Sequence, residues 1–338
     1  MKDVLSPEHF NLTLVNWASK YGRHDLPWQQ HPTPYSVHVS EIMLQQTQVT
    51  TVIEYFKRWM SAFPNLLALA NADEDEVMSH WQGLGYYSRA RNLQKAARYL
   101  VDEFSGHYPR TLKQIEQIPG VGRYTAGAIV SFAYNERGPI VDGNVRRLFC
   151  RYFAIEGVPS TTEVNNKLWQ YAEHYTLAKN CRAYAQSLLD MGAMICTPKS
   201  PDCPNCPIND SCQAYQTDRV AQLPTPKPKK HTPTKIGQFL WIEQNNQLYL
   251  QKRPAPGIWA GLWCLPQLDT EQIREVAPSQ RKGTFKHVFS HYKLDAEVLN
   301  ANSTEQLSGQ FFSPKQIVSL GLPTPIRKFI GKHLANTK

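Results

Sequence analysis

Four cysteines close together near the middle of the chain restrict its folding more than any other feature. They follow the pattern Cys196-x6-Cys203-x2-Cys206-x5-Cys212, with four prolines interleaved. A short loop stiffened by proline can bring four thiolates to one centre at a small cost in conformational entropy. Four sulfur ligands are typical of tetrahedral zinc or of an iron–sulfur cluster. The spacing therefore predicts a closed, structural metal centre at residues 196–212, and by itself it leaves the choice of metal open.

The wider composition limits the class of protein. An odd total of seven cysteines, with no basic and then apolar leader at the N-terminus, disfavours a disulfide framework. No apolar run reaches the roughly eighteen residues of a membrane span, so we expect a cytoplasmic protein with no membrane partner. The formal net charge of +9 favours a polyanionic partner. On charge alone, a basic soluble protein without such a partner stays open.

The pattern of apolar residues predicts a largely helical part over residues 8–219. Ser40 is a plausible N-cap for a helix that continues to Met60. Other helices are expected near 88–104, after Gly122 and directly after Asn144. We therefore expect a mainly α N-terminal region over 1–223.

The composition changes abruptly after this region. Residues 224–235 are rich in proline and lysine and have no apolar period, which is typical of an extended basic linker. Beyond it, residues 239–242 and 247–251 look like two strands joined by a turn at Asn245–Asn246. Further strands are expected near 285–289 and 293–299, and a final helix after Pro325. We therefore expect a small α/β domain over 236–338.

The segment IPGVGRYTAGA at residues 118–128 places two glycines before a predicted helix. Gly120 and Gly122 permit a tight turn and a close approach to phosphate, and the free amides of the helix N-terminus can bind the anion. The basic residue Arg123 strengthens this interpretation. The alternative is a plain turn that connects two helices.

Two carboxylates are candidates for chemistry. Asp142 precedes Asn144 in the segment VDGNV, and Glu41 follows Ser40 at the expected start of a helix. Taken alone, Asp142 or Asn144 could simply cap a helix, and Glu41 could simply favour the helix dipole.

At this point longer motifs resemble the MutY family, the adenine DNA glycosylases of the helix-hairpin-helix superfamily related to endonuclease III. The matching segments are SEIMLQQTQV at 40–49, GLGYY at 83–87, VDGNV at 141–145 and DMGAMIC at 190–196. The resemblance covers nearly the whole chain. It implies a helix-hairpin-helix glycosylase fold with an iron–sulfur subdomain, and it implies that the four cysteines hold a [4Fe–4S] cluster.

The resemblance also implies catalytic roles. Glu41 would protonate N7 of adenine and then activate water. Asp142 would stabilise positive charge at C1′ or form a transient covalent bond there, as in retaining glycosidases. Asn144 would orient Asp142, and Tyr124 would contact the same region. Tyr124 stands where endonuclease III has its lyase lysine, and Asn144 follows the aspartate. Both differences indicate a monofunctional enzyme. Arg146 stands where some relatives have a lysine that can form a Schiff base, so no such trapping is expected.

The same resemblance places the DNA contacts. A flipped adenine would enter a pocket formed by Leu26, Trp28, Leu44 and Gln186. Gln46, Leu84 and Tyr86 would fill the space that the flipped base leaves in the stack. Trp28 could equally be an ordinary core tryptophan.

Residues 236–338 resemble the nudix-like domain of this family, although the metal carboxylates of nudix hydrolases are absent. We therefore expect recognition without hydrolysis. The loop Phe289, Ser290 and His291 would read 8-oxoguanine, although Ser290 could also be a plain turn residue.

The predicted protein is thus a monomeric repair enzyme, associated with the bacterial nucleoid through its DNA substrate. That substrate is double-stranded DNA with adenine opposite 8-oxoguanine or guanine, and the product is an abasic site. One alternative is a bifunctional glycosylase and lyase like endonuclease III. The other is a non-catalytic DNA-binding iron–sulfur protein, for which the two carboxylates would have no reason to accompany an adenine pocket.

Overall fold

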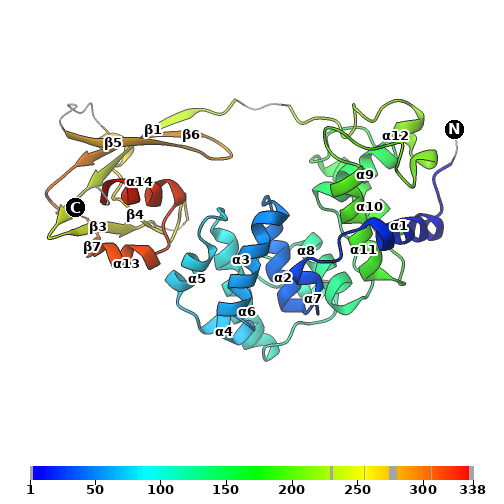
Figure 1. Ribbon diagram of the computed structural model, residues 1–338, viewed down its shortest axis with the longest axis horizontal. Coiled ribbons are helices and arrows are strands. Elements are labelled where there is room, and N and C mark those ends of the chain that lie inside the picture. The colour runs from blue at the N-terminus through cyan, green and yellow to red at the C-terminus, as the bar shows by residue number, and fades with distance from the viewer. Residues whose placement is uncertain (1–2, 229–230, 255, 274–279, 306, 335–338) are drawn as a thin grey trace. The chain divides into compact units, whose positions relative to one another are not determined.

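The computed structural model describes residues 3–228, 231–254, 256–273, 280–305 and 307–334. The chain divides into two compact units (Figure 1). The first combines Met1–Ala70 with Lys95–Lys229, and the second combines Asn71–Gln94 with Lys230–Lys338. Of the predicted linker 224–235, residues 229 and 230 lie outside the described part.

The first unit is helical. Its elements are α1 (Pro7–Tyr21), η1 (Pro27–Gln29), α2 (Pro34–Leu44), α3 (Val49–Ala62), α4 (Leu66–Asn71), α7 (Leu112–Ile115), α8 (Arg123–Ile129), η2 (Val130–Tyr134), α9 (Gly143–Tyr152), α10 (Thr162–Tyr175), α11 (Cys181–Asp190), η3 (Met191–Ile195), η4 (Asn209–Ser211) and α12 (Gln213–Gln216). Helix α6 (Ser88–Phe104) continues from the second unit into the first. Helix α2 packs against α8, and α1 packs against α11. The helices predicted near 88–104, after Gly122 and after Asn144 are confirmed.

The predicted helix start at Ser40 is wrong. Thr33 caps α2 by accepting a hydrogen bond from the Ser36 amide at 3.1 Å, and Pro34 occupies the first helical position. Ser40 is buried inside the helix, where its hydroxyl donates to the Val37 carbonyl at 3.0 Å. The helix ends at Leu44, so the single helix expected up to Met60 is two helices. Glu41 therefore lies in the C-terminal half of α2 and not in a first turn.

The second unit contains α5 (Glu74–Trp81) and two small sheets. Its other elements are β1 (Thr234–Trp241), β2 (Glu243–Gln244), β3 (Gln247–Lys252), β4 (Trp263–Cys264), η5 (Thr270–Gln272), β5 (Arg281–Val288), β6 (Lys293–Asn300), β7 (Gly309–Phe312), α13 (Pro314–Ser319) and α14 (Thr324–Leu334). One sheet has the order β1-β6-β5, with β1 parallel to β6. In the other, β3 pairs antiparallel with β2, β4 and β7.

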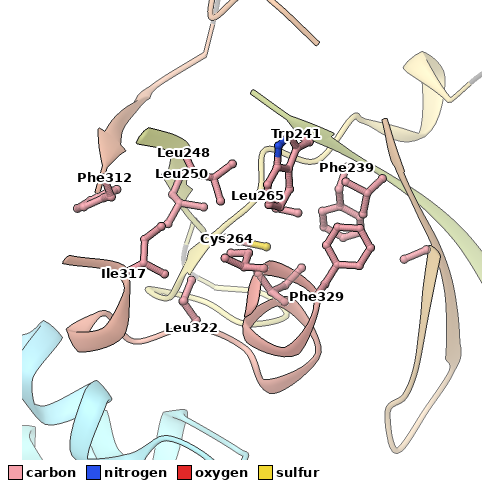
Figure 2. Packing of buried hydrophobic residues seen from close by; sticks show 14 of the residues in the cluster. Phe239, Trp241, Leu248, Leu250, Cys264, Leu265, Phe312, Ile317, Leu322 and Phe329 are labelled. Carbon is pink, nitrogen blue, oxygen red and sulfur yellow. The ribbon is translucent and has the colours of Figure 1, made fainter. Parts of the chain in front are cut away.

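A single apolar cluster joins the two sheets to the last two helices (Figure 2). Phe239 and Trp241 come from β1, Leu250 from β3 and Phe329 from α14, and all four are buried. Strands with one apolar face can be stable only when such a face is covered, which is what this cluster does. The core thus fixes the strands that carry the β5–β6 turn at residues 289–292.

The predicted hairpin between 239–242 and 247–251 is wrong in its pairing. Asn245 and Asn246 do form the turn, and both have positive φ, of 48° and 60°. Across this turn, however, the partner of β3 is the two-residue β2, because the chain leaves the first sheet after Trp241. The strands expected near 285–289 and 293–299 are confirmed as β5 and β6, and the final helix as α14.

Over the parts of the chain that the structure describes, no helix combines the length and apolarity needed to cross a membrane.

Candidate active site

A cavity of about 1180 Å³ in the first unit gathers nearly all of the residues predicted for chemistry. Its walls come from α2, α8, α9, α11 and the segment around η1. All the predicted catalytic and adenine-pocket residues line it, namely Leu26, Trp28, Glu41, Leu44, Tyr124, Asp142, Asn144 and Gln186. Gln46 lines it as well. The volume is ample for a purine base with part of its sugar.

Glu41 is buried, with 5% of its surface exposed, although it faces this cavity. The hydroxyl of Tyr124 on α8 donates to Glu41 Oε2 at 2.5 Å. Burial raises the pKa of Glu41 to about 7, the Tyr124 hydrogen bond opposes that rise, and the negative charge of Asp142 adds to it. A carboxyl group with this pKa can hold a proton at neutral pH and give it up to a leaving base.

Asp142 caps α9 and also lines the cavity. Its Oδ1 accepts from the Val145 amide at 2.7 Å, and its Oδ2 accepts from Asn144 Nδ2 at 3.1 Å. Burial raises the pKa of Asp142, while these hydrogen bonds and the nearby Arg147 guanidinium oppose the rise. The capping interpretation is therefore correct, and it coexists with a carboxylate that is held rigidly at the cavity wall.

Arg147 belongs to the site although no sequence motif pointed to it. Its Nη2 donates to Asn144 Oδ1 at 2.9 Å and to the Gly192 carbonyl at 2.7 Å, and its Nε donates to the Cys196 carbonyl at 2.6 Å. A Cβ atom on Gly192 would lie 2.4 Å from the Cβ of Asn144, so only glycine fits there. The sequence did offer one signal for this contact: Arg147 stands three residues after Asn144, which places both side chains on one face of α9.

The expected base pocket has an apolar and a polar side. Trp28 is 8% exposed and packs edge-on against Phe56, with ring centroids 5.6 Å apart. On the polar side, Gln186 Nε2 donates to Asp190 Oδ1 at 2.9 Å. Asp190 also pairs with Arg23, and neither residue was predicted as part of the site.

The residues expected to enter the DNA stack have unusual backbone conformations. Gln46 and Tyr86 have positive φ, of 58° and 47°, and Tyr86 is half exposed. Such strain in exposed non-glycine residues is typical of functional loops. Leu84 is instead buried, with 7% of its surface exposed.

The two glycines of segment 118–128 differ in their conformations. Gly120 has a φ of 80°, which favours glycine, whereas Gly122 caps α8 with extended backbone and open space where a Cβ would stand. The Arg123 guanidinium lies 4.1 Å from the Trp169 ring centroid and pairs with Glu173 at 2.9 Å. Arg123 is therefore already held by α10.

The four clustered cysteines line one small cavity between α9 and the loop 196–212. Most of the other lining side chains are apolar, and the Arg151 guanidinium donates to Cys196 Sγ at 3.3 Å. Four thiols with a cationic neighbour and no carboxylate in the lining fit an anionic, thiolate-ligated cluster. Within the described residues, no group of three or more His, Cys, Asp or Glu side chains is arranged as a site for a single metal ion.

The turn between β5 and β6 presents the three residues predicted to read the lesion. Ser290 and His291 are exposed, and Ser290 Oγ lies 3.4 Å from His291 Nδ1. Phe289 is half-buried and packs against His287, Tyr292 and Trp259, with centroid distances of 4.5, 4.7 and 5.3 Å. An aromatic base thus supports two exposed polar side chains.

Comparison with known proteins gives the class. Residues 39–174 match the HhH-GPD superfamily of base excision DNA repair proteins, and residues 238–332 match the NUDIX domain. The fold is similar to a thermostable thymine-DNA glycosylase, with a TM-score of 0.57 and 27% identity over 62% of this chain and 97% of that one. It is also similar in fold alone to endonuclease III in a trapped covalent intermediate with DNA, at a TM-score of 0.51. The fold and the cavity therefore define a base-excision DNA glycosylase.

Full-length relatives then give the family. The adenine DNA glycosylase of Buchnera aphidicola subsp. Schizaphis graminum is 35% identical, covering 95% of this chain and 97% of the relative. The human adenine DNA glycosylase is 35% identical over 88% of this chain and 67% of its own length. This chain belongs to the adenine DNA glycosylase family. It is an adenine-specific DNA N-glycosylase of base excision repair, and the predicted fold class is confirmed.

Proposed function

We propose that this glycosylase hydrolyses adenine from mispairs with 8-oxoguanine or guanine, acts as a monomer, and leaves an intact abasic strand. One arrangement carries the proposal. Glu41, hydrogen bonded to Tyr124, and Asp142, fixed by Asn144, line one cavity large enough for a flipped nucleotide. A proton donor and a separate carboxylate are the two groups that glycosidic hydrolysis requires.

The reaction follows from these roles. Protonated Glu41 donates its proton to N7 of the flipped adenine, and the C1′–N9 bond then breaks with its electrons leaving on the base. The oxocarbenium-like sugar is stabilised by the Asp142 carboxylate. Glu41, now ionised, takes a proton from a water molecule whose oxygen bonds to C1′. The products are adenine and an abasic site, and Glu41 is protonated again.

The monofunctional assignment is supported by the cavity lining. Among the described residues no lysine lines the cavity, and Arg146, at the position where some relatives carry a lysine, lines it as well. Arginine keeps its proton and is a poor nucleophile at any working pH. The geometry therefore supports hydrolysis without a Schiff base.

The cysteines Cys196, Cys203, Cys206 and Cys212 would hold the [4Fe–4S] cluster that the family implies. Such a cluster supplies structural cross-linking of the loop 196–212. Arg147 joins the Cys196 carbonyl to Asn144, so the order of this loop supports the order of the carboxylate wall.

The recognition of 8-oxoguanine is assigned to the β5–β6 turn. Ser290 and His291 are exposed side chains on a rigid aromatic base and can offer hydrogen bonds to the altered edge of the lesion. This assignment places catalysis in residues 1–223, lesion recognition in 236–338 and a basic connection in 224–235.

The deciding experiment compares duplexes with adenine opposite 8-oxoguanine, guanine or thymine. After incubation with the protein, half of each sample is treated with alkali. We expect strand breaks only after alkali, fastest with 8-oxoguanine and least with thymine. Glu41→Gln is the matched control and should show no excision while still binding the duplex. Equal rates on all three duplexes, or breaks without alkali, would contradict the proposal.

A further inference from the structure

The fold that carries the β5–β6 turn is larger than residues 230–338, because the second compact unit also takes in residues 71–94. Helix α5 is attached to the sheet of this unit by one carboxylate. Asp75 Oδ1 pairs with Lys252 Nζ at 2.8 Å, and Asp75 Oδ2 accepts from Trp263 Nε1 at 3.2 Å. Lys252 and Trp263 stand opposite each other on β3 and β4. Both oxygens of Asp75 are therefore bound by side chains that the sheet itself holds in place.

A second attachment joins the start of α6 to the loop before α14. The Tyr87 hydroxyl donates to the Leu322 carbonyl at 3.2 Å, and both residues are buried. A Cβ atom on Gly321 would lie 2.7 Å from the Cβ of Met78, so glycine lets this loop lie directly against α5. The Gly321 carbonyl also accepts from the Trp263 amide at 3.0 Å. The same loop is thus fixed both to β4 and to segment 71–94.

Between these two attachments the chain forms a loop whose backbone needs support. Gly83, Gly85 and Tyr86 have positive φ, of 99°, 70° and 47°. Such a conformation is unfavourable for a tyrosine, and it persists where the surrounding structure fixes it. Arg89 Nη2 provides part of this support by donating to the Leu84 and Gly85 carbonyls at 3.0 and 3.1 Å. The loop is held in this way while Tyr86 stays half exposed at its surface.

We propose that Asp75 and Tyr87 are positioning residues that hold this loop on the nudix-like fold, so that the β5–β6 turn and Tyr86 engage the DNA together. The inference rests on the proposed function, which assigns lesion recognition to the turn, and on the insertion of Tyr86 into the base stack. A side chain that replaces a flipped base has to displace base stacking, and this costs free energy. A loop released at either attachment would lose part of its binding energy to being ordered again.

The test is a double-mutant cycle between a positioning residue and the inserted side chain. Single-turnover excision of adenine opposite 8-oxoguanine is measured for the wild type, Asp75→Asn, Tyr86→Ala and the double variant. Asp75→Asn keeps the shape of the side chain but removes the charge that pairs with Lys252. We expect its rate to be about fivefold lower than that of the wild type. In the double variant the Asp75 substitution should cause little further loss, because the side chain that it positions is already absent.

Base extrusion is followed separately by the fluorescence of 2-aminopurine placed beside the adenine, which increases when its neighbour leaves the stack. Asp75→Asn should slow this increase by the same factor as excision. Glu76→Gln, which alters an exposed carboxylate on the same helix, is the matched control and should leave both rates unchanged. Independent, multiplying losses from Asp75→Asn and Tyr86→Ala, the result of a merely structural role, would overturn the proposal. So would a wild-type rate in either single variant.

Tyr87→Phe guards against failure of Asp75→Asn to fold. It removes one hydroxyl and keeps the buried ring, so excision should slow when Tyr86 is present and should not slow further in Tyr86→Ala. The same loss in both backgrounds would overturn the proposal. The wild-type preference for 8-oxoguanine over guanine is measured alongside. If that preference is present but the cycles show no coupling, this inference fails and the proposed function stands, whereas absence of the preference would contradict the proposed function and this inference with it.

Discussion

Tyr124 Oη and Glu41 Oε2 lie 2.5 Å apart, although the two residues are 83 positions apart in sequence. The contact joins α8, which begins directly after Gly122, to the C-terminal half of α2. The hydrogen bond favours the ionised form of Glu41, while burial favours the neutral form, and burial has the larger effect on the pKa. The proton that excision requires is therefore held by a balance between two opposing influences.

Removal of the Tyr124 hydroxyl should shift this balance. In Tyr124→Phe the hydrogen bond that lowers the pKa of Glu41 is lost, so that pKa should rise above about 7. Excision needs protonated Glu41, so the high-pH limb of the single-turnover rate profile should move to higher pH. Tyr134→Phe, which removes a hydroxyl that donates to the Tyr108 carbonyl, is the control and should not move it. A shift of the Tyr124→Phe limb to lower pH would refute the balance described here.

Glu41 should also make stability depend on pH. Its folded pKa of about 7 lies above its ordinary value of 4.5, so the folded state binds the extra proton between these values. The contribution of Glu41 to the free energy of unfolding is then greatest below pH 4.5. It falls by about 3 kcal/mol as the pH rises through 7. Glu41→Gln does not titrate, and its stability relative to the wild type should increase over that interval. Denaturant melts of both proteins at about pH 5 and pH 8 measure the difference, and a constant difference would contradict it.

The loop 196–212 should carry iron and sulfide. The purified protein should be brown, with broad absorption near about 400 nm. Cys203→Ser should lower thermal stability and DNA affinity, because loss of one ligand loosens the loop that Arg151 and Arg147 hold. Colourless protein with stoichiometric zinc after anaerobic purification would show that the cluster assignment is wrong.

Borohydride should trap no covalent complex between the wild-type protein and DNA. Arg146 lines the cavity, but arginine remains protonated and cannot form a Schiff base. Arg146→Lys would bring an amine into the cavity lining, and trapping should appear. Gel analysis after borohydride treatment measures this, with Lys95→Arg on α6 as a control that should change nothing. Efficient trapping by the wild type would restore the bifunctional alternative.

The β5–β6 turn should govern selectivity and not the chemical step. Ser290→Ala should weaken the preference for 8-oxoguanine over guanine several-fold, because a single hydrogen bond is typically worth about 1 kcal/mol net. Replacement of Phe289, Ser290 and His291 together should weaken it much more, since Phe289 packs on Trp259 and supports the turn. Binding and single-turnover rates of the full-length variants measure both. Unchanged discrimination in the triple variant would place lesion recognition elsewhere.

Local patterns in the sequence determine much of this protein by themselves. The helices after Gly122 and Asn144, the turn at Asn245–Asn246 and the strands β5 and β6 follow from glycine, capping and alternation signals that act within a few residues. The family motifs also led to Glu41, Tyr124, Asp142 and Asn144, which the structure brings to one cavity. Their catalytic roles stay predictions.

Tertiary structure alone decided the properties that depend on distant residues. The pKa of Glu41 depends on burial between α2 and α8. Asp190 accepts a hydrogen bond from Gln186 and is paired with Arg23, which lies 167 positions away in sequence. Segment 71–94 groups with residues 230–338, which no composition change near Asn71 indicates. Desolvation, ion pairing and hydrogen bonding act through space, so their strength is set by which side chains packing brings together and not by neighbours in the chain.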